Sequence, residues 1–433
     1  MRLLASDLAG ATNGQLVGPD VLCSGATIDS RQVAGGQLFV PVVAERNGHE
    51  FVPAAVAAGA VAYFTSEPPT WGGTAVVVAD TTLALADAGR RARQQLGDRV
   101  VGITGSVGKT SVKDLTAAAL RAGLRVAAAD KSFNNELGVP LTLLNAPDDT
   151  EVTVVEMGAR GPGHIALLCS IAQPTIGVVT AVAAAHTALF GDLDGVARAK
   201  GELVESLPAN GTAILNADDD RVLAMASRTT ATVVTYGERG DVRAEQLVFD
   251  DDLHPRFRLI SPWGSEEVQL TVSGRHMAHN ALAAAAVGLT LGLSPAAVAE
   301  GLRRASLSPW RMALGRTAGG ARVLNDAYNA NPASMRAALD ALAALPGSRK
   351  IAVLGVMAEL GADSAEQHLA LAGLVRSSGA ELIAVGTDLY GVRPVADLVA
   401  LQDELRSLGK DVAVLVKASR VGGLETLAVA LAQ

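Results

Sequence analysis

Apolar residues along the chain fall into short runs rich in Val and Ile and longer runs rich in Ala and Leu. The short runs predict strands at residues 99–104, 152–155, 175–179 and 213–215, and a helix at 83–96 precedes the first of them. Each strand is followed by a polar loop and then by helical periodicity. This alternation is typical of largely parallel sheets covered by helices, so the sequence predicts an α/β fold.

Turn-rich segments indicate where this α/β pattern is divided into domains. The first part contains strand candidates at 37–41 and 76–78, and the pattern breaks again after residue 305. Residues 249–272 alternate as antiparallel strands do. We therefore predict a small N-terminal α/β domain (1–98), a central domain with a parallel sheet (99–308) and a C-terminal α/β domain (309–433).

Composition narrows the class of protein. The length of 433 residues agrees with about three domains, and 49% hydrophobic against 18% charged residues excludes a mainly disordered chain. The net charge of −8, without a run of five Lys or Arg, gives no basis for nucleic-acid binding. Cys23 and Cys169 lie far apart, which argues against a disulfide framework and a cysteine zinc site. The chain has neither a signal-peptide core nor about 18 consecutive apolar residues, so we expect a cytosolic protein without a membrane span.

The strongest local motif is the segment GITGSVGKTS at residues 102–111, between a predicted strand and a predicted helix. Its glycines allow backbone N–H groups to converge on phosphate oxygens, Lys109 supplies a positive charge, and Thr110 offers a hydroxyl to Mg²⁺. The strict pattern GxxxxGK[ST] is not met because Ile103 occupies the first glycine position. An incidental glycine-rich turn is the alternative. The residues expected to bind phosphate are Gly105, Ser106, Val107, Gly108, Lys109, Thr110 and Ser111.

Three further polar residues follow the strands of this region, and only Glu156 becomes a candidate through its place beside the phosphate loop. Glu156 ends a predicted buried strand, where its carboxylate could hold the metal ion that Thr110 also contacts. Taken alone, it could equally be a solvated residue. His186 and Lys200 follow the next strand, and by themselves a lone His is usually structural and a helical Lys usually solvated.

Four segments in order resemble motifs of the Mur ligase family of ATP-dependent amide-forming ligases. They are TGSVGKTS at 104–111, SFNNELGVP at 132–140, EMGA at 156–159 and AKGE at 199–202. The segment NDAYNANPASM at 325–335 is similar to the signature of family members that add D-alanyl-D-alanine to UDP-N-acetylmuramoyl-tripeptide. The similarity extends over essentially the whole chain, with departures at Asn47, Met277, Trp310, Val356 and Ala418.

The resemblance implies a three-domain architecture with a P-loop ATPase-type central domain and a Rossmann-like C-terminal domain. It implies two Mg²⁺ ions, one bound by Thr110 and Glu156, and one bound by His186 and by Lys200 after CO₂ has converted that lysine to a carbamate. Lys109, Lys200, His186 and Glu156 are the implied catalytic residues.

The remaining implied residues bind substrates. Asn280 matches a position that contacts adenine, and Arg311 and Asp326 match residues that contact the γ-phosphate and the ribose. The resemblance assigns the uridine nucleotide to Asp29, Ser30 and Arg31, although a structural turn is the alternative there. It assigns the muramoyl-peptide to Asn134 and Asn135, and the incoming dipeptide to Tyr328, Asn329 and Asn331.

The expected activity is therefore amide formation between UDP-N-acetylmuramoyl-tripeptide and D-alanyl-D-alanine, through an acyl phosphate, in peptidoglycan precursor synthesis. We expect a monomer. Two alternatives stay open: another amino-acid ligase of the family, such as the tripeptide-forming or a folylpolyglutamate-type enzyme, and a nucleotide-dependent switch that uses the phosphate loop without amide chemistry.

Overall fold

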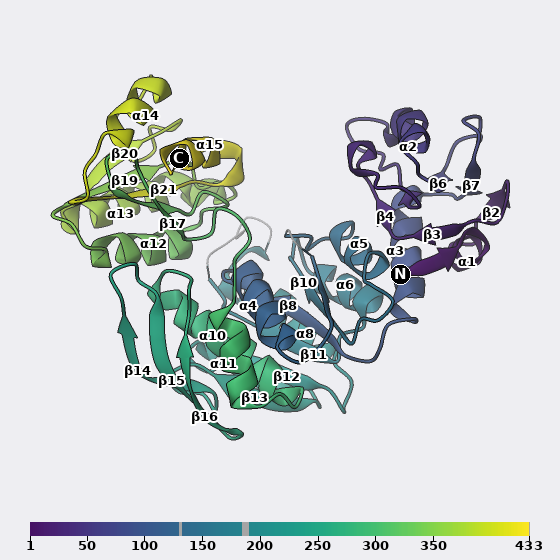
Figure 1. The fold of residues 1–433 in the computed structure, drawn as a ribbon, viewed down its shortest axis with the longest axis horizontal. Coiled ribbons are helices and arrows are strands. Elements are labelled where there is room, and N and C mark those ends of the chain that lie inside the picture. Colours follow the sequence, from purple (N-terminus) through teal and green to yellow (C-terminus); the bar gives the residue numbers. More distant parts are fainter. Residues whose placement is uncertain (130–131, 184–189, 433) are drawn as a thin grey trace.

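The computed structural model describes residues 1–129, 132–183 and 190–432, which form five β-sheets with helices packed against them (Figure 1). The first and last parts of the chain lie at opposite ends of the molecule, and the largest sheet lies between them (Figure 1). Most strand pairs in the three larger sheets are parallel. The predicted α/β fold is confirmed. No helix in the described ranges is long and apolar enough to cross a membrane.

The N-terminal sheet has the strand order β2-β7-β6-β5-β4, with only β2 antiparallel to its neighbour. Beside it lies a two-stranded antiparallel sheet of β1 and β3. The predicted strand at 37–41 is shorter in the structure, because only residues 38 and 39 pair on both sides. The elements are β1 (Arg2–Leu4), α1 (Ala5–Ala11), β2 (Gln15–Val17), β3 (Leu22–Ser24), β4 (Ala26–Thr27), β5 (Leu38–Phe39), α2 (Val52–Ala57), β6 (Ala62–Thr65) and β7 (Thr74–Val77).

Helix α3 (Thr81–Arg93) connects the N-terminal sheet to the central one. It begins at the N-cap Asp80, which accepts from the N–H groups of residues 82 and 83, and so starts two residues before the predicted helix. α3 packs against α1 on one side and against α5 (Gly138–Leu144) and α6 (His164–Ala172) on the other. The core therefore runs continuously from the first sheet into these two helices.

Two polar residues join the same parts of the chain. Arg93 is buried, and its guanidinium donates to the carbonyl oxygens of Leu96, Gly97, Ala172 and Gln173 at 2.8–3.3 Å, so one side chain ties the ends of α3 and α6 together. The side-chain amide of Asn145 accepts from the N–H of Ala26 (3.0 Å) and donates to its carbonyl (2.9 Å). Asn145 thus pairs with the free edge of β4 as a neighbouring strand would.

The central sheet has six parallel strands in the order β13-β12-β11-β8-β10-β9. The predicted strands at 99–104, 152–155, 175–179 and 213–215 agree with four of these to within one residue at each end. The short edge strand β9 gave no such pattern. The elements are β8 (Val100–Thr104), α4 (Lys109–Arg121), β9 (Val126–Ala128), β10 (Val152–Glu156), β11 (Ile176–Val179), α8 (Leu193–Glu205), β12 (Thr212–Asn216), α9 (Asp220–Leu223) and β13 (Thr232–Tyr236).

An antiparallel sheet and two helices complete this part of the fold. The antiparallel segment begins earlier than predicted, because β14 starts at Arg243 rather than near 249. Helix α10 is apolar from Ala281 to Leu289 and packs between α4 and the strands β12–β15, which explains why this part is hydrophobic all round. The elements are β14 (Arg243–Phe249), β15 (Pro255–Ser261), β16 (Gly264–Gln269), α10 (Arg275–Thr290) and α11 (Pro295–Arg303).

The C-terminal sheet has the order β17-β18-β21-β19-β20, in which only β17 is antiparallel. Two arginines of this sheet, Arg316 and Arg322, form ion pairs with Asp252 in the turn between β14 and β15. These pairs join the C-terminal sheet to the antiparallel one. The elements are β17 (Ala313–Arg316), β18 (Arg322–Asn325), α12 (Pro332–Ala344), β19 (Arg349–Leu354), α13 (Ser364–Ser377), β20 (Glu381–Ala384), α14 (Leu398–Arg406), β21 (Val412–Lys417) and α15 (Glu425–Leu431).

Candidate active site

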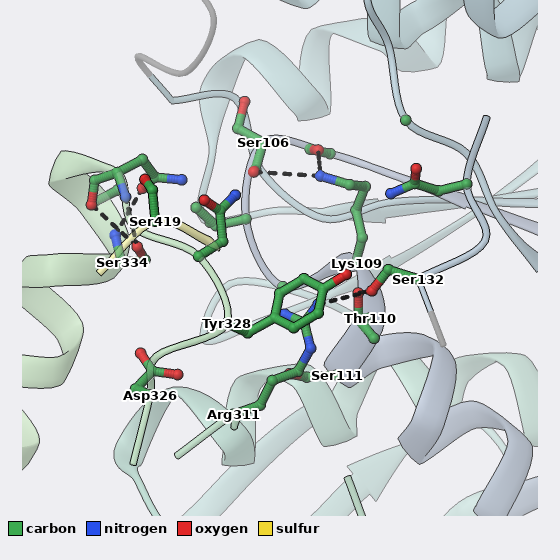
Figure 2. A pocket seen from close by; sticks show the side chains of 18 of the residues that line it. Ser106, Lys109, Thr110, Ser111, Ser132, Arg311, Asp326, Tyr328, Ser334 and Ser419 are labelled. Carbon is green, nitrogen blue, oxygen red and sulfur yellow. Dashed lines mark hydrogen bonds between the residues drawn. The ribbon is translucent and has the colours of Figure 1, made fainter. Parts of the chain in front are cut away.

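A cleft of about 610 Å³ lies where the carboxyl ends of the central strands face the C-terminal sheet (Figure 2). Such strand ends are where ligands bind in open α/β sheets. Most residues predicted from the sequence line this one cleft. They are Gly105, Ser106, Val107, Gly108, Lys109, Thr110, Ser111, Asn134, Glu156, Lys200, Asn280, Arg311, Asp326, Tyr328, Asn329 and Asn331.

The loop between β8 and α4 has the backbone of a phosphate-binding turn. Gly105 (φ 148°) and Gly108 (φ 82°) both have positive φ, and a Cβ at Gly105 would collide with the hydroxyl of Thr180 at the end of β11. The loop is fixed from the same side, because Ser106 N–H donates to the carbonyl of Ala181 at 2.8 Å. The first turn of the 13-residue helix α4 therefore points its free N–H groups into the cleft.

Lys109 is folded back over this loop. Its ammonium donates to the carbonyl of Gly105 at 2.7 Å, so it lies where a phosphate held by the loop would be. Burial lowers the pKa of Lys109; the Glu156 carboxylate opposes this shift and the Arg311 cation adds to it. A bound polyphosphate would supply the negative charge that this buried cation lacks.

Thr110 and Glu156 come together because β8 and β10 are neighbouring parallel strands, with Glu156 paired to Ile103. The Thr110 hydroxyl donates to Glu156 Oε2 at 2.7 Å, and Asn134 Nδ2 donates to Glu156 Oε1 at 2.8 Å. One hydroxyl oxygen and one carboxylate at the mouth of a phosphate loop are the oxygen donors that Mg²⁺ uses beside substrate phosphates. The donor set therefore fits Mg²⁺ at this position.

Lys200 projects from α8 into the bottom of the cleft and is 4% exposed. Burial, and secondarily the Lys109 cation, hold its pKa well below the usual value for lysine. His186, predicted to share a metal ion with Lys200, lies outside the described residues. Within those residues, no group of three or more His, Cys, Asp or Glu side chains could hold a metal ion.

The other side of the cleft belongs to the C-terminal part of the chain. Arg311 reaches Ser132 Oγ with Nη2 (2.9 Å), and its guanidinium lies 4.0 Å from the ring centroid of Tyr328 (Figure 2). Asp326 forms an ion pair with Lys417, which also donates to the carbonyl of Asn329 at 2.9 Å. Arg311 and Asp326 therefore face the phosphate loop across the cleft.

Several predicted residues also have structural partners. The side chain of Asn331 caps α12 in a reciprocal capping box with Ser334, and the Asn329 side chain accepts from the N–H of Ala330 at 2.9 Å. Asn280 Nδ2 lies 3.7 Å from the sulfur of Met277. Trp310 precedes Arg311 with φ 62°, a conformation in which glycine is favoured, and Arg420 stacks on its ring at 4.4 Å.

Four predicted residues are not in the cleft. Asn135 accepts from the N–H groups of residues 137 and 138, so its side chain stabilises the turn that leads into α5. Asp29, Ser30 and Arg31 lie in the N-terminal part, where Asp29 caps a short 3₁₀ turn and pairs with Arg31 at 2.8 Å. This pairing lowers the pKa of Asp29 to about 2, while the side chain of Arg31 is 86% exposed.

The cleft also contains residues that the sequence reading did not select: Ser132, His276, Ser334, Lys417 and Ser419. Lys417 was the easiest of these residues to detect from the sequence, because a charged residue directly follows five apolar residues of a buried strand, β21. Ser132 carried no signal beyond its place in the quoted segment 132–140, and Ser419 carried none of its own, because serine is common in any loop.

Comparison with known proteins agrees with this geometry. Residues 103–288 match the family model for the Mur ligase middle domain, and residues 310–428 match that for the Mur ligase, glutamate ligase domain. UDP-N-acetylmuramoyl-tripeptide–D-alanyl-D-alanine ligase of Escherichia coli (strain K12) is 36% identical over 98% of this chain and 97% of its own. The chain belongs to the Mur ligase family.

Solved structures of other Mur ligases resemble this Mur ligase over its whole fold. A crystal structure of MurF from Acinetobacter baumannii, 30% identical, matches with a TM-score of 0.87 over 100% of this chain and 99% of that one. MurF ligase from Thermotoga maritima in complex with ADP, 26% identical, matches with a TM-score of 0.82 over 94% and 96%. The predicted family and three-domain architecture are confirmed, and the Mur ligase is an enzyme of the ligase class.

Proposed function

We propose that this Mur ligase joins D-alanyl-D-alanine to the terminal carboxylate of UDP-N-acetylmuramoyl-tripeptide, with conversion of ATP to ADP and phosphate. The observation that carries the proposal is the single cleft in which a phosphate loop, an oxygen-donor pair and a buried lysine face Arg311 and Asp326. Full-length similarity to the Escherichia coli ligase supports the choice of substrates.

The chemistry explains why these groups are needed together. A carboxylate is a poor electrophile, so its oxygen first attacks the γ-phosphorus of ATP, which releases ADP and forms an acyl phosphate. The dipeptide amine then attacks the acyl carbon and phosphate leaves, so that an amide replaces the phosphoanhydride bond that was broken. Both steps move negative charge onto phosphate oxygens, and positioned cations and N–H groups stabilise that charge.

Named residues supply these functions. The N–H groups of the loop and Lys109 would hold the β- and γ-phosphates, and Thr110 with Glu156 would hold one Mg²⁺, which neutralises phosphate charge when bound. Arg311 would contact the γ-phosphate, Asp326 the ribose and Asn280 the adenine. Closure of the C-terminal domain over the cleft would limit the access of water to a hydrolysable acyl phosphate.

Lys200 is proposed to act as a carbamate. Its depressed pKa favours the neutral amine, and that is the form which adds to CO₂. The product is an anion, suited to a second Mg²⁺ that His186 would share. The carbamate anion would also lie near the Lys109 cation, where an opposite charge is favoured.

The uridine nucleotide is proposed to bind the N-terminal domain at Asp29, Ser30 and Arg31. Arg31 is the exposed cation there and can pair with a diphosphate. Asn134 would contact the muramoyl-peptide, with Asn135 shaping the same loop. Tyr328, Asn329 and Asn331 would lie on the side of the incoming dipeptide.

We place the domain boundaries near residues 98 and 308, where the chain passes from one large sheet to the next.

The enzyme is proposed to work in the cytosol, where ATP and its UDP-linked substrate are available, and as a monomer. Size-exclusion chromatography with light scattering tests the last point. A mass twice that of the chain would contradict it.

The deciding experiment measures phosphate release with Mg-ATP and UDP-N-acetylmuramoyl-tripeptide, with and without D-alanyl-D-alanine, together with mass spectrometry of the product. We expect dipeptide-dependent release and a UDP-N-acetylmuramoyl-pentapeptide. Lys109→Ala should abolish both, while Lys410→Ala, at a surface turn, serves as the control. Turnover with another amine would assign a sister ligase, and turnover independent of any amine would favour a nucleotide switch.

A further inference from the structure

One serine connects the two sides of the cleft. Ser132 lies in the loop after β9, and its Oγ is 3.0 Å from Thr110 Oγ1 and 2.9 Å from Arg311 Nη2. Thr110 belongs to the phosphate loop and Arg311 to the segment that leads into the C-terminal sheet. Figure 2 shows the Ser132 side chain next to that of Thr110, with the end of the Arg311 side chain close by.

The direction of these hydrogen bonds follows from their chemistry. The single proton of the Thr110 hydroxyl is donated to the Glu156 carboxylate at 2.7 Å, so Thr110 Oγ1 can only accept from Ser132. Ser132 Oγ in turn accepts from Arg311, because a guanidinium has no acceptor atom. A one-way series of hydrogen bonds therefore runs from the Arg311 cation through two hydroxyls to the Glu156 carboxylate.

Arg311 depends on this serine for its position. Its bond to Ser132 is the only hydrogen bond that Arg311 makes among the described residues, and its Nε is buried without a partner. Its other contact is the face of Tyr328, which restrains the plane of the guanidinium but not its rotation within that plane. The remaining donors of Arg311 are thus left free for an anion in the cleft.

We propose that Ser132 is a positioning residue that aligns Arg311 with the Thr110–Glu156 pair, so that the third domain approaches the nucleotide in one fixed geometry. The inference rests on the proposed function, in which that pair and Arg311 act on the same triphosphate. Among the described residues, Ser132 contacts the phosphate loop through the Thr110 hydroxyl and makes no hydrogen bond with the loop backbone. Its loss should therefore affect the reaction step much more than nucleotide binding.

The test compares Ser132→Ala with Ser132→Thr, which keeps the hydroxyl, in the phosphate-release assay. We expect Ser132→Ala to lower kcat about 10- to 100-fold, the factor associated with one charge-assisted hydrogen bond, while KM for ATP changes less than about threefold. Ser132→Thr should retain at least about half of the wild-type kcat. Wild-type kcat in Ser132→Ala would overturn the proposal.

A double-mutant cycle separates positioning from local structure. In an Arg311→Met background, Ser132→Ala should cause no further loss, since the residue through which Ser132 acts is already gone. An undiminished loss in that background would overturn the proposal, because Ser132 would then act by another route.

A second readout needs no peptide substrate and so distinguishes failure of this proposal from failure of the proposed function. Trp310 adjoins Arg311, and replacing Trp71 and Trp263 by Phe leaves it as the only tryptophan of the chain. Ser132→Ala should change the emission of Trp310 or its response to Mg-ATP, and Ser132→Thr should not. Identical spectra and responses in all three proteins would refute the positioning role even if the substrates proved to be different.

Discussion

Arg93 offers a quantitative test of how the N-terminal and central parts are joined. Replacing it with Met keeps the apolar stem of the side chain but removes all four hydrogen bonds to carbonyl oxygens. Ala172 is fully buried, so its carbonyl loses its partner, whereas Gly97 and Gln173 are exposed and water can replace theirs. A buried unsatisfied carbonyl costs about 1–3 kcal/mol, and each rehydrated one about 0.5–1.5 kcal/mol.

Part of this loss is offset, because the variant no longer buries a guanidinium. Burial lowers the pKa of Arg93, which shows that its charged form is disfavoured at this position. We expect a net loss of about 2–4 kcal/mol in the free energy of unfolding. At about 2–4 °C per kcal/mol for a cooperative unit of this size, Tm should fall by at least about 4 °C.

The assay is thermal melting followed by circular dichroism. Arg90→Met is the matched control on the same helix, because Arg90 pairs with Asp87 at the surface, where ion pairs contribute little. The reasoning would be refuted if Arg93→Met melted within about 1 °C of the wild type, or if Arg90→Met lost as much.

Three further outcomes are expected. Glu156→Gln removes the carboxylate charge and places an amide nitrogen against the side chain of Thr110 or Asn134. The rate of phosphate release should therefore fall about 100-fold or more. Retention of half the activity would contradict the metal-site geometry. Depletion of CO₂ should inactivate the wild-type enzyme, and bicarbonate should restore its activity. The Lys200→Ala enzyme should stay inactive under both conditions. A fully active Lys200→Ala enzyme would exclude the carbamate. The Asp29 carboxyl should titrate near pH 2 when it is followed by NMR. Because this pKa lies below the ordinary 3.8, the contribution of the carboxylate to stability is complete above about pH 4 and is lost as the pH falls toward 2. A titration midpoint at pH 3.8 would disprove the pairing with Arg31.

The parts of the site that the sequence predicts are those fixed by local structure. The phosphate loop follows from a strand, two glycines and a helix within ten residues, and Glu156 joins it because parallel neighbours bring their carboxyl ends to one edge. The long buried strands were placed well for the same reason. Strands of two or three residues offer few positions for a pattern, so β9 was missed and β5 was predicted longer than it is.

The unpredicted features depend on contacts between distant segments. Ser132 and Arg311 are 179 residues apart, and only the placement of the third domain brings them together. The role of an asparagine is hard to predict from the sequence for another reason. Its side chain is equally suited to contacting a ligand, capping a helix and stabilising a turn. Asn331 caps α12 and lines the cleft, whereas Asn135 lies outside the cleft and accepts from two N–H groups in the turn before α5.

The pairing of Asn145 with Ala26 has a consequence for how the chain folds during synthesis. Most of the first sheet leaves the ribosome early, but the outer edge of β4 has no partner until Asn145 and the helices α5 and α6 emerge. During that interval an open strand edge and an uncovered apolar face are available to other chains. Nascent chains stalled before residue 145 should therefore recruit chaperones more strongly than chains stalled after residue 172. Chain length alone would give the opposite order, because the longer chains expose more incompletely folded sequence.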